Sequence, residues 1–208
     1  MAEFEAMREL PLAGSAPAER ADARRNRERI LAAARELLGR RDLRELTMDE
    51  LATQAGVAKG TIFHRFGNRA GLAVALVDDA ERELQDLLLS GPPPLGPGAP
   101  ARDRLAAFLD ALLQHTVDNV RLLIISDYDE PGGRYRTGAY AAWRLHSARL
   151  LEELGYRRAR AEGLAHALLA PLAADLIDHR LRNEGADLTE IKRECRALVE
   201  ALADHARA

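Results

Sequence analysis

Apolar residues recur at helical spacing along almost the whole chain. Ile30 opens a stripe that continues through Leu37 and Leu38, and comparable stripes return in most later segments. A repeat of three to four residues buries one face of a helix, whereas a strand needs strict alternation. Alternation is confined to the short run Leu122–Ile125, which fits buried helix equally well. The pattern therefore predicts an all-α protein of about nine helices.

Glycine and proline clusters separate these helical segments. The ten residues 91–100 hold five prolines and three glycines, which cannot continue a helix. Residues 1–19 have no apolar stripe and are expected to form a flexible arm. These breaks suggest a first domain over residues 20–70 and a second domain over residues 71–208.

The most informative stretch is residues 46–66, LTMDELATQAGVAKGTIFHRF. Thr47 and Glu50 have the spacing of a capping box, which would open a short helix. Gly56 supplies a turn position at which a positive φ costs little, and a second short helix is expected over residues 58–65. Two such helices predict a helix-turn-helix, although an ordinary helical hairpin with a solvated outer face has the same spacing.

The charge distribution favours a polyanionic partner for the first domain. Residues 20–70 carry twelve Lys and Arg against seven Asp and Glu, whereas residues 71–208 carry 17 against 22. A basic region on an acidic remainder is the electrostatic footprint of a nucleic-acid binder. At the start of the first helix, Arg24, Arg25 and Arg27 could grip phosphate or the minor groove, or form a solvated basic helix start.

Residues 46–66, together with the helix expected over Arg27–Arg40 and the segment 68–72, resemble the DNA-binding domain of TetR-family transcriptional regulators. That family shows the pattern Ala-x-x-Ala-Gly-Val-Ser-x-Gly-Thr-Leu/Ile-Tyr-x-x-Phe, and residues 52–66 read ATQAGVAKGTIFHRF. The resemblance spans about residues 24–75. It implies a homodimeric regulator of transcription that binds a palindromic operator, in the form of a repressor that a small molecule releases from DNA.

The resemblance also assigns roles on double-stranded DNA. Thr47 would offer its hydroxyl or amide to a phosphate at a helix N-terminus, and Lys59, Gly60 and Thr61 would enter the major groove first. The remaining positions would face phosphate or bases and comprise Phe63, His64, Arg65 and Arg69. Phe63 stands where the family has a phosphate-binding tyrosine, and Ala58 replaces the serine that caps the recognition helix.

The second domain would correspond to the family's effector-binding and dimerisation domain. Its candidate polar cavity residues are His115, Asn119, Tyr128, Tyr140, Trp143 and His146, each of which could also be ordinary core or surface. Pro171 interrupts a leucine ladder and could kink a helix beside a cavity. The alternative is a DNA-binding protein whose second domain serves assembly alone, without an effector.

Two leucine-striped segments near the C-terminus, about residues 158–182 and 188–206, are the expected dimer interface. In the family such helices pair with their copies into a four-helix bundle, although the stripes could instead close the chain's own core. The residues assigned to the interface are Leu164, Leu168, Leu172, Leu176, Ile191, Leu198 and Leu202.

Several other classes of protein find no support in the sequence. A single cysteine, Cys195, excludes an internal disulfide framework, and Asp175 with His179 suggests an ion pair rather than a metal site. No catalytic constellation is apparent, so neither an enzyme nor a cofactor is expected. The acidic start of the chain and the absence of a long apolar run predict a cytoplasmic protein with no membrane span.

Overall fold

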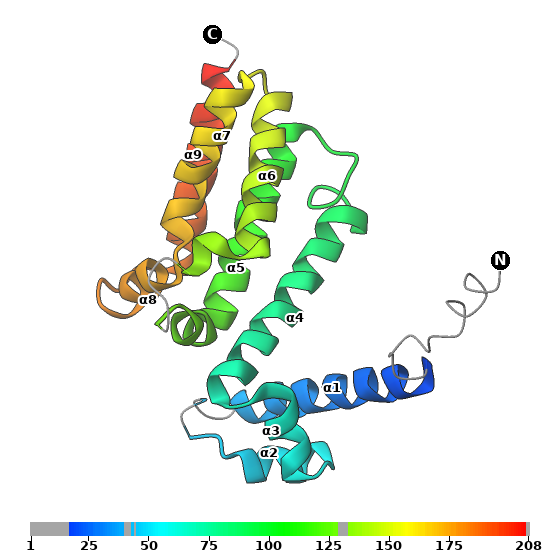
Figure 1. Ribbon diagram of the computed structural model, residues 1–208. Helices are drawn as coiled ribbons and strands as arrows, with labels where there is room; N and C mark the ends of the chain where they lie inside the picture. The colour runs from blue at the N-terminus through cyan, green and yellow to red at the C-terminus, as the bar shows by residue number, and fades with distance from the viewer. Residues whose placement is uncertain (1–16, 40–42, 44, 129–132, 207–208) are drawn as a thin grey trace, which may run out of the picture. The chain divides into compact units, whose positions relative to one another are not determined.

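The computed structural model describes residues 17–39, 43, 45–128 and 133–206. Within these ranges the chain forms nine α-helices and two 3-10 helices, η2 and η3, and contains no strand (Figure 1). The all-α prediction is confirmed. In the described ranges, every helix is too short or too polar to serve as a membrane span.

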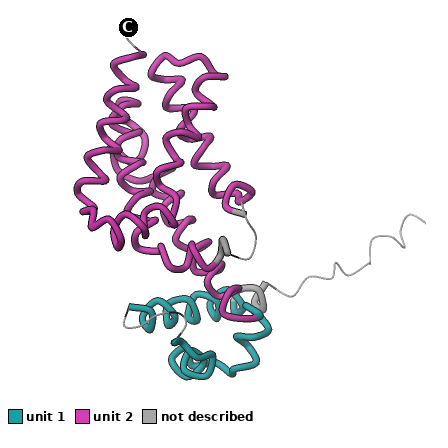
Figure 2. Tube along the Cα trace, turned by 90° about the vertical axis from the view of Figure 1, so that its left-hand side faces the viewer, with its two compact units in different colours: residues 1–67 teal, residues 68–208 magenta. Residues whose placement is uncertain are grey.

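The chain divides into two compact units, Met1–Gly67 and Asn68–Ala208 (Figure 2). The division falls at residue 67, slightly before the predicted boundary at residue 70. Most of the predicted arm, 1–19, lies outside the described residues, but Pro17 already begins the first helix. Residues 17–19 are therefore helical and do not belong to an arm, because proline in a first helical turn loses no hydrogen bond.

Unit 1 contains three helices, α1 (Pro17–Leu38), α2 (Met48–Ala55) and α3 (Lys59–Phe66). Helix α1 starts ten residues before the predicted Arg27, because its first turns are polar and show no apolar stripe. Helix α2 packs against both α1 and α3. The largest fully buried side chains of this unit come from the helices and the segment before α2, and they include Ile30, Leu31, Leu46, Leu51 and Ile62.

Local chemistry fixes the two ends of α2. Thr47 Oγ1 accepts a hydrogen bond from the Glu50 amide at 3.2 Å, while Glu50 Oε2 accepts one from the Thr47 amide at 3.1 Å. This reciprocal pair is the predicted capping box. At the other end Gly56 has φ 62°, and the Val57 amide donates back to the Ala52 carbonyl. Since only glycine adopts this conformation without steric cost, Gly56 sets the turn that leads into α3.

Unit 2 contains α4 (Arg69–Ser90), α5 (Ala101–Tyr128), α6 (Gly138–Glu153), α7 (Arg158–Leu169), α8 (Ala174–Arg182) and α9 (Leu188–His205). Helix α5 is its centre, since it packs against α4, α6, α8 and α9, while α7 packs on α6. Fully buried side chains of α5, among them Leu105, Phe108 and Leu113, form the middle of one continuous core.

The leucine ladder predicted as one helix over residues 158–182 is divided into three pieces. Helix α7 ends at Leu169, the 3-10 helix η3 covers Ala170–Leu172, and α8 begins at Ala174. Pro171 has no amide hydrogen to donate, and Ala173 adopts an extended backbone with ψ 134°. The prediction of a continuous helix is therefore wrong, because an i+4 leucine repeat continues across a break that proline imposes.

Candidate nucleic-acid interface and effector cavity

Helix α3 presents a polar outer face and a buried inner one. Ile62 is fully buried and Phe66 nearly so, while Gly60, His64 and Arg65 are exposed. Phe63 also lies on the outer side, with 43% of its surface exposed. The outer face offers cationic and hydrogen-bonding groups, a set suited to phosphates and base edges.

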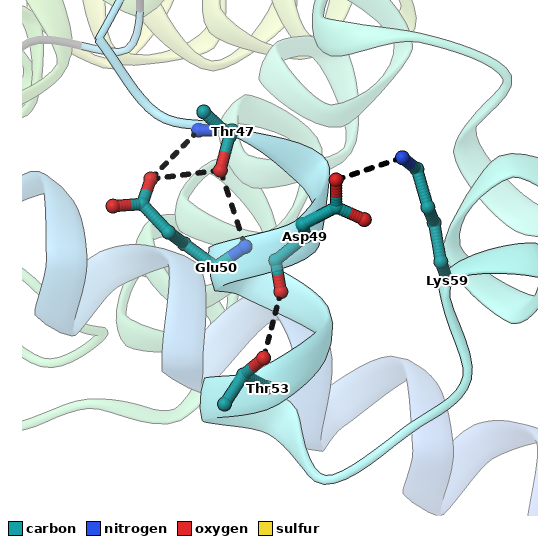
Figure 3. Close-up of polar contacts among 5 residues, drawn as sticks. All are labelled: Thr47, Asp49, Glu50, Thr53 and Lys59. Atoms are coloured by element: carbon teal, nitrogen blue, oxygen red, sulfur yellow. Dashed lines mark hydrogen bonds and ion pairs between the residues drawn. The ribbon is translucent and has the colours of Figure 1, made fainter.

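Lys59, the first residue of α3, is paired within the unit. Its Nζ lies 2.8 Å from Asp49 Oδ2 on α2 (Figure 3). The same Nζ lies 5.9 Å from the centre of the Phe63 ring. Both partners of the ion pair remain open to solvent, with 53% of the lysine and 67% of the aspartate side chain exposed. The ammonium group that was predicted to reach DNA is thus held by an acidic neighbour in the free protein.

Thr47 is hydrogen-bonded to Glu50, the acidic residue that follows Asp49 in α2. Its hydroxyl donates to Glu50 Oε2 at 2.9 Å, and its amide donates to the same carboxylate oxygen (Figure 3). Both groups assigned to a phosphate are therefore already satisfied. In this form Thr47 acts as a helix cap, and phosphate binding there requires that the capping box open.

The remaining predicted DNA contacts lie on α1, on α3 and at the start of α4. Arg24 pairs with Glu28 at 2.8 Å and Arg25 pairs with Asp22, both within α1. Arg27 is half-buried, and Arg69 is exposed as the first residue of α4. Thr61 is half-buried on α3. The two arginine pairs are short-range contacts on one helix, where ion pairs stabilise weakly.

Unit 2 contains a cavity of about 710 Å³. Its apolar lining includes Leu112, Trp143, Leu169 and Leu172, and its polar lining comes mainly from α4 and from the segment around η2 (Gly133–Arg136). A hollow of this size that combines apolar side chains with polar groups is typical of a small-molecule site.

The six candidate cavity residues divide into two groups. His115, Tyr140 and Trp143 line the cavity. Burial lowers the pKa of His115 below its ordinary value, so its ring is neutral near pH 7. Tyr140 is nearly buried, and its hydroxyl lies 2.7 Å from His166 Nδ1. Burial also raises the Tyr140 pKa, so this hydroxyl stays protonated.

Asn119 and His146 are not among the residues that line this cavity. Asn119 donates to the His115 carbonyl one turn earlier in α5. His146 packs edge-on against Phe108 at 5.0 Å between ring centres. Its burial, and then the charge of Arg104, lower the His146 pKa from 6.5 to about 4. The side chain of Tyr128 lies outside the described part of the chain.

Sequence reasoning missed the polar wall that α4 contributes to the cavity. Asp78, Glu81, Arg82 and Gln85 all line the hollow, as does Arg134 at η2. The missed signal was the spacing of these α4 residues, which places polar groups on one helical face at positions i, i+3, i+4 and i+7. Thr116, another lining residue, is buried and donates to the Leu112 carbonyl at 2.9 Å.

The predicted dimer residues differ sharply in exposure. Leu168, Leu172 and Ile191 are buried in the core of unit 2, so the structure corrects their assignment to an interface. They have almost no surface left for a partner. Leu164 and Leu202 are half-buried against the same core, whereas Leu176 and Leu198 expose 40% and 46% of their surface.

Among the described residues, His, Cys, Asp and Glu side chains form no group of three or more that could hold a metal ion. Near the predicted ion pair of α8, His179 Nε2 instead lies 3.4 Å from Glu184 Oε1.

Comparison with known proteins identifies the first unit and the fold. Residues 30–76 match the family model of bacterial regulatory proteins of the tetR family. A search of the curated proteins finds no match.

Three solved structures illustrate the shared fold. A transcriptional regulator from Rhodococcus sp. Rha1 has a TM-score of 0.65 at 19% identity, covering 86% of this chain and 96% of its own. A putative transcriptional regulator from Saccharomonospora viridis in complex with choline has a TM-score of 0.65 at 19% identity, covering 84% and 95%. BioQ with its double-stranded DNA operator has a TM-score of 0.59 at 18% identity, covering 86% and 98%.

The matched residues contain the whole helix-turn-helix, from the buried start of the α1 stripe through α3 to the first turns of α4. The all-helical fold extends the similarity over most of the chain. Residues 30–76 are thus similar to bacterial regulatory proteins of the tetR family, and the chain shares its fold with solved transcriptional regulators.

Proposed function

We propose that the chain is a cytoplasmic repressor that binds a palindromic operator as a homodimer and leaves it when a small molecule fills the cavity of unit 2. The observation that carries the proposal is the exposed outer face of α3, where Gly60, His64 and Arg65 stand open beside a buried inner face. Such a helix can enter the major groove and expose its first residues to base edges.

The solved relatives support both halves of this proposal. BioQ was crystallised on its operator, and the regulator from Saccharomonospora viridis holds choline. In this chain, a hollow of about 710 Å³ lies in unit 2, whereas α3 belongs to unit 1. A ligand that binds one of two conformations more tightly shifts the population towards it, which is how occupation of the cavity would change affinity for DNA.

The test begins with the DNA. Fragments of the source genome are incubated with the full chain, and the bound fragments are sequenced and measured by mobility shift. We expect a palindrome whose half-sites lie about 34–36 Å apart or somewhat more. Arg65→Ala should weaken binding, whereas Arg158→Ala, a change of equal charge at an exposed ion pair of α7, should not.

The effector is tested on the same operator complex. Small molecules are screened for release, and Ala142→Phe, which reduces the cavity from its wall, should abolish the response while operator binding persists. Release that survives in this variant would place the effector elsewhere. A chain that no small molecule releases would favour the alternative in which unit 2 serves assembly alone.

A further inference from the structure

The proposed DNA-binding face carries a negative charge, that of Asp49, beside the cation at the start of α3. Asp49 Oδ2 lies 2.8 Å from Lys59 Nζ, a distance at which an ammonium group also binds a phosphate oxygen (Figure 3). The pair joins the first turn of α2 to the first residue of α3. Lys59 therefore reaches DNA only by leaving Asp49, or by bringing the Asp49 carboxylate close to the phosphate.

The local fold does not require this ion pair. Thr47 and Glu50 already cap the N-terminus of α2, and Gly56 forms its C-terminal turn. An exposed ion pair of this kind contributes only about 0–1 kcal/mol to stability. The ion pair is thus weak enough for Lys59 to leave Asp49 for another anion. It is also strong enough to change the affinity of the chain for DNA several-fold.

We propose that Asp49 is an intramolecular competitor of the DNA backbone for Lys59, and that it lowers the affinity of the chain for DNA of any sequence. The inference rests on the proposed DNA-binding face of α3. A carboxylate and a phosphate are both anionic oxygen acceptors, so the exchange of one for the other yields little net free energy. The displaced Asp49 then faces the phosphates with an uncompensated charge.

The ion pair would therefore limit the non-specific affinity of the chain for DNA, which is the part that does not depend on base sequence. Contacts between cations and phosphates supply most non-specific affinity and are weakened by salt. With Lys59 held by Asp49, the outer face of α3 gains less from random DNA. Contacts to base edges from other residues of α3 then decide where the regulator remains bound.

The experiment compares Asp49→Asn with the unchanged full-length chain on the selected operator and on random duplex DNA. The substitution keeps the shape of the side chain and removes its charge. We expect binding two- to five-fold tighter on both duplexes, and a salt dependence of log K steeper by about one unit. Glu162→Gln is the control, because it removes an equal charge from the exposed Arg158–Glu162 pair of unit 2 and should leave both affinities unchanged.

A second pair of variants tests whether Lys59 carries the effect. Lys59→Met should weaken binding to both duplexes, and Asp49→Asn in that background should produce less than half of its original gain in log K. Unchanged or weaker binding of Asp49→Asn alone would overturn the inference, since Asp49 would then be inert or would position Lys59 on DNA. Failure of the unchanged chain to bind any fragment would instead contradict the proposed function.

Discussion

At the scale of single residues, the space around Gly60 indicates whether the fold itself or a binding partner requires glycine at this position. A Cβ atom added at Gly60 would meet no other atom within 4 Å, and the residue lies in a regular helix. Gly56 also has open space, but its φ of 62° requires glycine. The free protein therefore gives no reason for glycine at position 60, whereas close approach of the backbone to DNA does.

Gly60→Ala should leave the folded chain as stable as before, or more stable by up to about 1 kcal/mol, because alanine favours helix. Operator affinity should nevertheless fall by about tenfold, equivalent to about 1.4 kcal/mol, since the added methyl group separates α3 from the groove. Urea denaturation and mobility-shift titration measure the two effects. Gly163→Ala is the matched control on α7, where a Cβ also has open space, and it should leave operator affinity unchanged.

His146 links a single buried ring to the pH dependence of stability. Its pKa falls from 6.5 to about 4 in the folded chain, chiefly through burial. The unfolded chain therefore binds a proton that the folded chain refuses between these two values. The contribution of His146 is fully present above pH 6.5 and is lost as the pH falls towards 4.

His146→Phe should remove this part of the pH dependence, because phenylalanine cannot take up a proton in either state and can still pack against Phe108. The free energy of unfolding should decline less steeply from pH 7 to pH 5 in the variant than in the unchanged chain. Urea denaturation at the two pH values provides the comparison. Parallel declines would show that His146 titrates normally when folded.

At the scale of helices, the sequence predicts a helix well where capping and turn residues mark the ends of an apolar stripe. The capping box and Gly56 bound α2 as expected, and α4 ends at the predicted Ser90. The start of α1 was missed because its first turns have no apolar stripe. The Asp49–Lys59 pair could not be predicted, since it depends on the distance between two helices rather than on the period of one helix.

The N-terminus of α3 provides a test of how much an N-cap residue stabilises a helix. Ala58 occupies the N-cap position with an extended backbone, φ −67° and ψ 142°, but has no side chain that could accept from the helix amides. Ala58→Ser should therefore stabilise the chain by about 1 kcal/mol. Thr47→Ala, which removes the existing cap of α2, should destabilise it by a similar amount. A rise in the urea midpoint for the first variant and a fall for the second, at constant m-value, would confirm both.

At the scale of the whole molecule, a leucine stripe alone does not tell which surface it covers. Leu168 and Ile191 share their spacing with Leu176 and Leu198, yet the first two are buried by neighbouring helices and the last two remain exposed. Periodicity identifies the apolar face of a helix, but the packing of the other helices decides how much of it is left over. The exposed leucines of α8 and α9 are the surface that a second copy would cover in the proposed homodimer.

Leu198→Glu tests that assembly directly. Leu198 exposes 46% of its surface, so glutamate there should leave the isolated chain folded. In a two-fold interface the same change buries an unpaired charge, which costs about 3–5 kcal/mol. We expect sedimentation at micromolar concentration to show a dimer for the unchanged chain and a monomer for the variant.

Operator affinity should fall as well, because a monomer binds one half-site and loses simultaneous engagement of both. Leu145→Glu, at a leucine of α6 that exposes 57% of its surface, should remain dimeric. A monomeric unchanged chain that still binds its palindrome tightly would contradict the proposed assembly.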